Sequence, residues 1–313
     1  MKIKVQLTLR LCAISFLVVF TAIIYVAYFY APTEYQTESA YLKTISSEFV
    51  TTSNFNIHFT HSGSGAPLIL IHGGGTWLYS FRANIPALAE HYSVYALDMP
   101  GHGYTQIKNN DARYDLDMMA QVLLEFMQTQ GLEKVSLVGH SWGGGWALYF
   151  AEKYPDRVEK LALIDSGGLD IPDKLEWQLL KYPIIGEFIS KVITDADVRR
   201  GLEDAFFNKA LVTTEMVDEI KVPLSFSDNR RAQYLLERNL NWKKTEQNLS
   251  HIAMPILIIW GANDQYLSVN AALQFKELIP QAEIQILENC GHSAHEEYPQ
   301  EVNQMIINFI DSK

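Results

Sequence analysis

The chain has 313 residues, of which 48% are hydrophobic, and its formal net charge is −11. This length fits one large domain or two small ones, and the acidic balance argues against nucleic-acid binding. The two cysteines, Cys12 and Cys290, lie far apart in the sequence, so we expect neither a disulfide within a domain nor a CxxC metal knuckle.

The amino-terminal segment predicts a membrane anchor. Residues 11–30 carry no charged side chain, and 20 helical residues span about 30 Å, the thickness of a hydrocarbon core. The alternative is a signal peptide, cleaved so that the rest of the chain is secreted. Its apolar region would be shorter and followed by small residues, whereas here Tyr28, Phe29 and Tyr30 close the run. The sequence favours an uncleaved transmembrane anchor.

The charges around this run predict its orientation. Lys2, Lys4 and Arg10 precede it, and acidic residues follow it. The positive-inside rule places residues 1–10 in the cytoplasm and everything after residue 30 on the outer side, whether periplasmic, extracellular or lumenal.

The remaining chain predicts one α/β domain with an insertion. Residues 31–47 are polar and are expected to form a linker to a domain at 48–313. Strand-like and helix-like stretches alternate from residue 48, which indicates a mostly parallel central sheet with helices on both faces. The alternation stops at about residue 167 and resumes after about 250, so we expect a helical lid over 167–250.

A Gly-x-Ser-x-Gly sequence at residues 139–143 lies between an apolar strand-like run and a helix-like run. Such a tight strand-to-helix turn exposes the hydroxyl of its serine, here Ser141, and places it over a helix N-terminus that favours negative charge. Serine is a weak nucleophile until a base removes its proton. Candidates for the base and the acid follow later in the chain: Asp264 after one strand and His292 after the last strand.

These blocks, with His72-Gly73-Gly74-Gly75 after a buried strand, resemble the α/β-hydrolase superfamily over residues 49–310. The resemblance implies a triad in the order of this family, with Ser141 as nucleophile, Asp264 as acid and His292 as base. It also implies backbone oxyanion donors at Gly74 and Trp142.

Two alternatives concern individual residues of this site. Asp165 follows the strand after the elbow, a position that some family members use for the triad acid, so it is the alternative acid. His292, His295, Glu296 and Glu297 could be interpreted as a metal cluster, but their spacing is not that of a known metal motif. We therefore expect no metal and no cofactor.

Serine rather than aspartate at the elbow favours acyl transfer over epoxide or haloalkane chemistry. The default reaction is hydrolysis of a carboxylic ester through an acyl-enzyme, on an apolar small-molecule acyl substrate. The alternatives are a carbon–carbon bond hydrolase, a proline iminopeptidase-like peptidase and, outside enzymes, a catalytically silent anchored binding protein. The natural substrate and the oligomeric state stay open at this stage.

Overall fold

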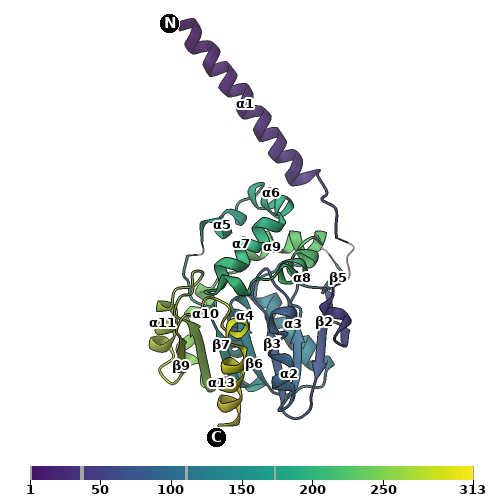
Figure 1. Cartoon of the computed structure of the whole chain (residues 1–313), viewed down its shortest axis with the longest axis vertical. Helices are drawn as coiled ribbons and strands as arrows, with labels where there is room; N and C mark the ends of the chain where they lie inside the picture. The colour runs from purple at the N-terminus through teal and green to yellow at the C-terminus, as the bar shows by residue number, and fades with distance from the viewer. Residues whose placement is uncertain (1, 36–38, 110–111, 173, 313) are drawn as a thin grey trace.

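The computed structural model describes residues 2–35, 39–109, 112–172 and 174–312, with side chains from residue 6. Residue 1 of the predicted cytoplasmic segment, residues 36–38 of the predicted linker and residue 173 of the predicted lid therefore lie outside the described residues. Figure 1 shows a rounded domain with a helical layer at one end, from which a long amino-terminal helix projects.

A mixed sheet forms the centre of the domain, in the order β1-β2-β4-β3-β6-β7-β8-β9. The strands are β1 (Ser47–Thr51), β2 (Phe55–Ser62), β3 (Pro67–Ile71), β4 (Ser93–Leu97), β5 (Gln106–Ile107), β6 (Val135–His140), β7 (Val158–Ile164), β8 (Ile256–Gly261) and β9 (Glu283–Leu287). From β4 to β9 all neighbours pair in parallel, whereas β2 pairs antiparallel with β1, β4 and β5. This agrees with the mostly parallel sheet predicted from the sequence, and the antiparallel pairs lie at the edge formed by β1, β2 and β5.

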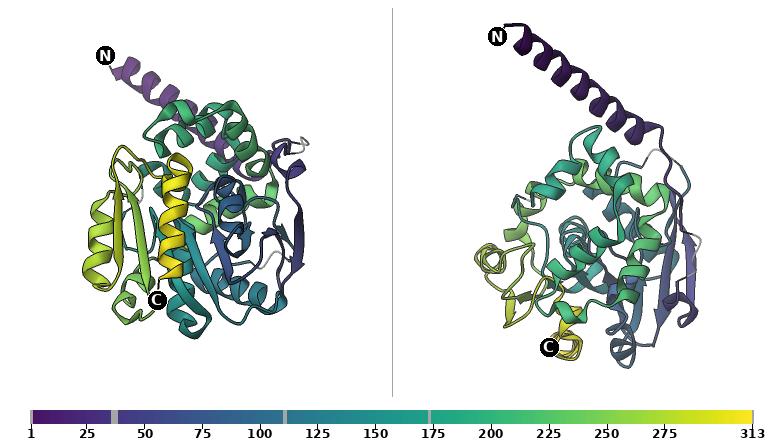
Figure 2. Two further views of the ribbon diagram at one scale, coloured as in Figure 1. Left: turned by 60° about the horizontal axis from the view of Figure 1, so that its bottom comes forward. Right: turned by 45° about the horizontal axis from the view of Figure 1, so that its top comes forward.

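Helices cover both faces of the sheet, as predicted (Figure 2). They bury two apolar clusters. One face carries α3 (Leu116–Thr129), α4 (Trp142–Lys153) and α11 (Asn270–Leu278). The other carries α2 (Ile85–Ala89), α12 (Ala294–Glu297) and α13 (Pro299–Asp311). The strands between them are buried on both sides, which explains why β3, β6 and β8 are almost continuously apolar.

A helical lid lies between β7 and β8 in the chain. Its helices are α5 (Leu175–Leu180), α6 (Ile185–Val192), α7 (Asp195–Ala205), α8 (Thr214–Leu224), α9 (Ser227–Asn239) and α10 (Lys243–Glu246). The helices α5 to α9 gather at the end of the molecule from which α1 projects (Figure 1). The lid residues that face the domain include Phe206 and Leu236, both of which are buried.

The first helix, α1 (Lys2–Tyr28), is long and apolar enough to cross a membrane, judged by length and composition. It begins well before residue 11, so the basic residues ahead of the apolar run belong to the same helix. Its described side chains are exposed except near its carboxyl end, where it packs against α6 of the lid.

The described residues of the segment after α1, which the sequence predicts to be a linker, make hydrogen bonds to the lid. Ser39 Oγ donates to Glu219 of α8 at 2.6 Å, and the Tyr41 backbone N–H donates to the same carboxylate at 3.1 Å. Earlier in the segment, Glu34 accepts a hydrogen bond from the Ser227 N–H at 2.7 Å. Polar composition alone predicts a solvated linker, but here the polar groups are partners of lid residues.

Candidate active site

The turn between β6 and α4 holds Ser141 in a backbone conformation that non-glycine residues rarely adopt, with φ 51° and ψ −122°. Two residues before and two residues after it, the chain is packed too tightly for a side chain. A Cβ at Gly139 would lie 2.5 Å from the Gly143 carbonyl oxygen, and one at Gly143 would lie 2.3 Å from the Ile71 carbonyl oxygen. The glycines of the motif are therefore required by the packing of β3, β6 and α4, and the strained turn carries Ser141 at the start of α4.

Ser141, His292 and Asp264 form one hydrogen-bonded chain, although they come from three loops. Ser141 Oγ lies 2.9 Å from His292 Nε2, and His292 Nδ1 lies 2.7 Å from Asp264 Oδ2. The other carboxylate oxygen of Asp264 accepts the backbone N–H groups of Tyr266 and Leu267 at 2.7 and 2.9 Å. An Nδ1–H tautomer of His292 satisfies both of its contacts, leaving Nε2 free to accept the serine proton.

The charges around His292 favour its protonated form. Burial by itself lowers the pKa of His292, but the adjacent Asp264 carboxylate, with a contribution from Asp165, raises it above its ordinary value. The side chain is only 7% exposed, so these charges act with little screening by water.

Asp165, the alternative acid, makes no hydrogen bond with His292. Its two oxygens accept the backbone N–H groups of Gly261 at 2.7 Å and Ala294 at 3.1 Å. It thereby joins the end of β8, which leads to Asp264, to α12, which follows His292. Complete burial, together with the charge of Asp264, raises the pKa of Asp165 to about 8.

The glycine loop after β3 lies against the side chain of Trp142. A Cβ at Gly74 would lie 2.5 Å from the Trp142 ring, so the loop backbone and the first residue of α4 are in direct contact. The indole N–H of Trp77, farther along the loop, donates to the Glu219 backbone carbonyl at 2.9 Å. The loop that contains Gly74 is thus fixed to the lid as well as to α4.

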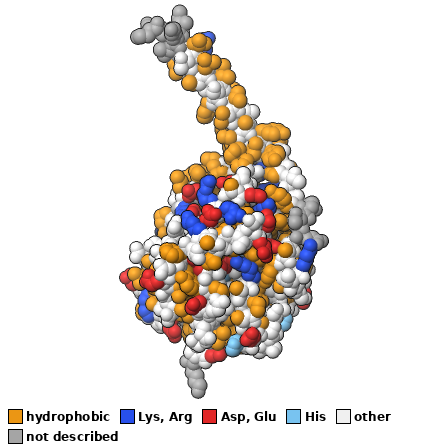
Figure 3. Space-filling model, viewed as in Figure 1, with side chains coloured by type: hydrophobic (Ala, Val, Ile, Leu, Met, Phe, Trp, Pro, Cys, Tyr) orange, Lys and Arg blue, Asp and Glu red, His pale blue; other side chains and the backbone are white. Residues whose placement is uncertain are grey.

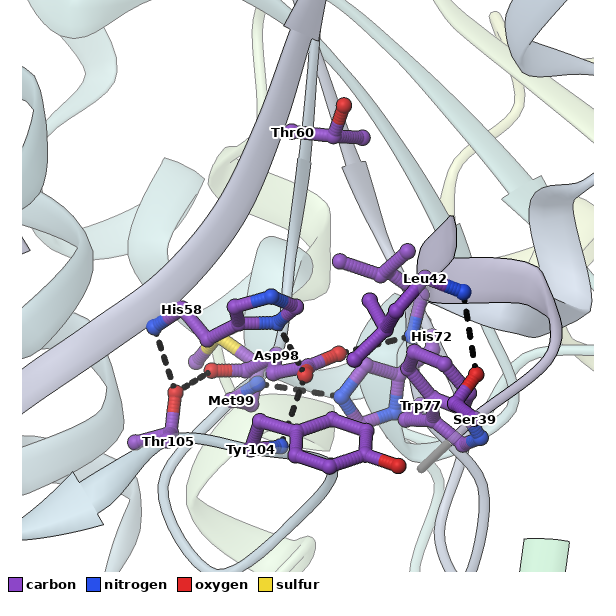
Figure 4. A network of polar contacts seen from close by, with 12 residues as sticks. Ser39, Leu42, His58, Thr60, His72, Trp77, Asp98, Met99, Tyr104 and Thr105 are labelled. Carbon is purple, nitrogen blue, oxygen red and sulfur yellow. Dashed lines mark hydrogen bonds and ion pairs between the residues drawn. The ribbon is translucent and has the colours of Figure 1, made fainter. Parts of the chain in front are cut away.

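A buried polar network surrounds His72, the residue at which this loop begins (Figure 4). His72 Nδ1 donates to the Gly73 carbonyl at 2.7 Å, and His72 Nε2 accepts the Met99 N–H at 3.0 Å. Burial lowers the pKa of His72, which keeps the ring neutral and able to make both bonds. Close by, Asp98 accepts bonds from His58 Nδ1 at 2.7 Å and from the Leu78 N–H at 2.8 Å.

Sequence reasoning left three lid and loop residues near the triad without a role. The Trp177 ring lies 5.6 Å from that of Trp142, and the Tyr266 ring lies 5.1 Å from that of His292. Lys174 Nζ lies 4.1 Å from the centre of the Tyr266 ring. The positive charge of Lys174 opposes the rise in the pKa of His292 that Asp264 causes. No motif in the sequence marks them, because each approaches the site only through the folding of the chain.

The histidines and glutamates near the triad do not form a metal site among the described residues, where no group of three or more metal-binding side chains is found. Glu296 is paired with Arg82 instead. Glu297 accepts the backbone N–H groups of Phe207 and Asn208 at 3.0 and 2.9 Å. His295 is fully buried, with its pKa lowered to about 3 by burial, and it packs 4.4 Å from the His140 ring.

Comparison with known proteins gives the family. The model of the alpha/beta hydrolase fold matches residues 66–188 and 210–299. A curated relative, a 2-hydroxy-6-oxononadienedioate/2-hydroxy-6-oxononatrienedioate hydrolase of Comamonas testosteroni, is 27% identical over 265 residues, which cover 82% of this chain and 92% of the relative.

Two solved structures are similar over different lengths. A meta-cleavage product hydrolase from Pseudomonas fluorescens, 25% identical, has a TM-score of 0.73 and covers 85% of this chain and 98% of its own. A membrane phospholipase A, described as a bacterial virulence factor, is 26% identical with a TM-score of 0.73 and covers 99% of this chain and 98% of its own. The curated relatives support the carbon–carbon alternative better than the ester prediction. Because the family model matches more than half of the chain, the chain belongs to the α/β-hydrolase family.

Proposed function

We propose that this chain is a membrane-tethered serine hydrolase that cleaves a carboxylic ester with an apolar acyl group. The observation that carries the catalytic part is the unbroken chain of hydrogen bonds from Ser141 through His292 to Asp264 beneath a lid.

The proposed reaction has two steps, acylation of Ser141 and hydrolysis of the acyl-enzyme, and the same groups act in both. His292 Nε2 takes the Ser141 proton as the oxygen attacks the ester carbonyl, and Asp264 stabilises the resulting imidazolium. The oxyanion accepts the N–H groups of Gly74 and Trp142, and the imidazolium gives its proton to the leaving alkoxide. Water, activated by the same histidine, then releases the acid from Ser141.

The proposal of an ester substrate rests on a similarity that includes the amino-terminal part of the chain. The similarity to the membrane phospholipase extends over 99% of the chain, whereas the similarity to the meta-cleavage product hydrolase covers 85%. The ring of Trp142, which follows Ser141, lies 5.6 Å from the ring of Trp177, and aromatic side chains beside a site suit an apolar acyl group. A tether places such a site next to substrates that partition into a membrane.

Carbon–carbon bond hydrolysis is the second candidate, and the curated relatives favour it. The relative from Comamonas testosteroni acts on a dioate, a class of substrate whose carboxylates need a cation. Lys174, close to Tyr266 and within electrostatic reach of His292, could supply one here.

A catalytically silent binding protein is disfavoured by the geometry of the elbow. A non-glycine residue held at positive φ costs on the order of 1–3 kcal/mol. The chain maintains this strain at Ser141 and also maintains hydrogen bonds to both partners. A protein that only binds its ligand has no need of this arrangement.

The experiment is labelling with a fluorophosphonate probe, followed by a substrate panel. We expect the wild-type protein to be labelled and Ser141→Ala not to be; equal labelling of a folded Ser141→Ala protein would sink the enzyme reading. The panel compares esters of graded acyl length with ring-fission dienones and aminoacyl-arylamides. Faster turnover of the dienones than of every ester would replace the ester proposal by the carbon–carbon reaction.

The tether and its orientation belong to the same proposal. The length, apolar composition and exposure of α1 support a single crossing with the amino terminus in the cytoplasm. Protease added to the outer side of sealed right-side-out membrane vesicles should reach the hydrolase domain in that orientation. Digestion only after permeabilisation would contradict it, and release of the mature chain without residues 1–30 would indicate a cleaved signal peptide.

A further inference from the structure

The place where α1 meets the lid has a consequence for the depth of the lid in the membrane. Among the described side chains of α1, only residues 23, 24, 26 and 27 are covered, and Ala27 is 3% exposed. The helix packs there against α6. Lys191 of α6 also donates to the Tyr30 carbonyl at 2.8 Å, which fixes the helix end to the lid.

The length of the apolar run places this contact within the membrane. If residues 11–30 span a hydrocarbon core of about 30 Å, Tyr30 marks its outer boundary. Residues 23–27 then lie between about 4 and 10 Å inside that boundary, at 1.5 Å per residue. A lid helix beside them reaches the same depth, which is the depth at which an interfacial amphipathic helix buries its apolar face.

The surface of this part of the lid has the matching composition. Tyr182, Ile185, Val192 and Ile193, at or beside α6, are between 40% and 59% exposed. Hydrophobic side chains continue from α1 onto the top of the lid in the space-filling view (Figure 3). The acidic residue of α6, Glu187, is paired with Arg238 at 2.7 Å, so its charge is compensated on the protein side.

We propose that α6 and its flanking residues form a membrane-embedded face of the lid, which lies in the outer interface of the bilayer that α1 crosses. The occupant of this apolar face is lipid, because α6 is continuous with the transmembrane helix. The proposal rests on the membrane anchoring proposed above, and it identifies the lid as the side from which a lipid-borne substrate reaches Ser141.

The test measures lipid contact at single sites of the full chain in vesicles. An environment-sensitive fluorophore is attached to a cysteine introduced as Ile185→Cys or Ile193→Cys in a Cys12→Ser background. Cys290 is fully buried and stays unlabelled. Native Cys12, exposed on α1, serves as the transmembrane control. Leu273→Cys serves as the matched control, because Leu273 is 53% exposed on α11, outside the lid.

Lipids that carry a quencher near the headgroup should quench the labels at 185 and 193 several-fold more than the label at 273. If the label at 12 is quenched but the labels at 185 and 193 are quenched no more than the control at 273, the membrane-embedded lid is overturned and the anchoring stays intact. A lack of quenching at 12 would show that the anchoring itself is wrong, and the lid proposal would fall with it. Shielding from water at 185 and 193 without lipid quenching would identify a second copy as the occupant and also overturn the proposal. Retained fluorophosphonate labelling shows that each variant is folded.

Discussion

Of two buried carboxylates at the site, Asp264 belongs to the triad and Asp165 lies outside it, and exchanging each for its amide should separate their roles. Asp264→Asn removes the charge that faces His292 Nδ1 at 2.7 Å and turns an acceptor into a possible donor. The histidine is then held in the wrong tautomer. By analogy with the same change in a serine protease triad, kcat should fall about 10⁴-fold, or about 5–6 kcal/mol.

Asp165→Asn should act on stability rather than on chemistry. Asp165 bonds to backbone N–H groups and not to His292, so the amide, which has the same size, leaves the hydrogen bonds within the triad in place. The amide has one acceptor oxygen for the two N–H groups of Gly261 and Ala294, which leaves one of them unpaired. An unpaired buried group costs about 1–3 kcal/mol of unfolding free energy, and we expect kcat to fall less than tenfold.

The assay compares kcat, KM and the midpoint of thermal unfolding for the two variants and the wild type, on one ester that the wild type turns over. A folded Asp165→Asn protein that loses as much kcat as Asp264→Asn would refute the assignment of the acid. So would an Asp264→Asn protein that keeps more than a tenth of the wild-type kcat.

Three further changes test other parts of the site. Gly74→Ala places a methyl group against the Trp142 ring and should lower kcat about 10²–10³-fold by displacing an oxyanion donor; unchanged kcat with normal unfolding would remove Gly74 from the site. The neutral form of His292 is the base, and the pKa of His292 is raised above 6.5. As the pH drops through that raised pKa, the ring becomes protonated and kcat/KM should fall. A limb centred below pH 6.5 in the pH–rate profile would contradict this. Glu219→Ala removes the acceptor of Ser39 Oγ and should raise amide hydrogen exchange after residue 38 while leaving β6 protected, whereas unchanged exchange would mean that this bond does not hold the segment.

The sequence reveals the catalytic residues well because the chemistry imposes strict local rules. Only glycine fits beside Ser141, so the elbow leaves a recognisable pattern, and the chain order of Asp264 and His292 follows from the order of the strands. The structure brings these three together.

The contacts that sequence reasoning missed are those between distant polar residues. The bonds from Ser39 to Glu219 and from Asp165 to Gly261 join segments about a hundred or more residues apart. Neither pair has a spacing that a motif can express. The position of Asp165 after a strand correctly marks it as part of the site, but only the geometry shows that it bonds to backbone N–H groups and not to His292.

The attachment of the amino-terminal segment determines what a soluble form of this protein would be. A cut between Tyr30 and Glu34 removes the apolar helix and keeps the bonds from Ser39 and Tyr41 to Glu219. A cut just before β1 also removes Ser39 and Tyr41, and the buried carboxylate of Glu219 then loses both donors. The backbone carbonyl of the same Glu219, on α8, accepts the bond from Trp77. A protease acting at the first position would therefore release a domain with its lid supported, while one acting at the second would release a domain whose glycine loop has lost part of its support.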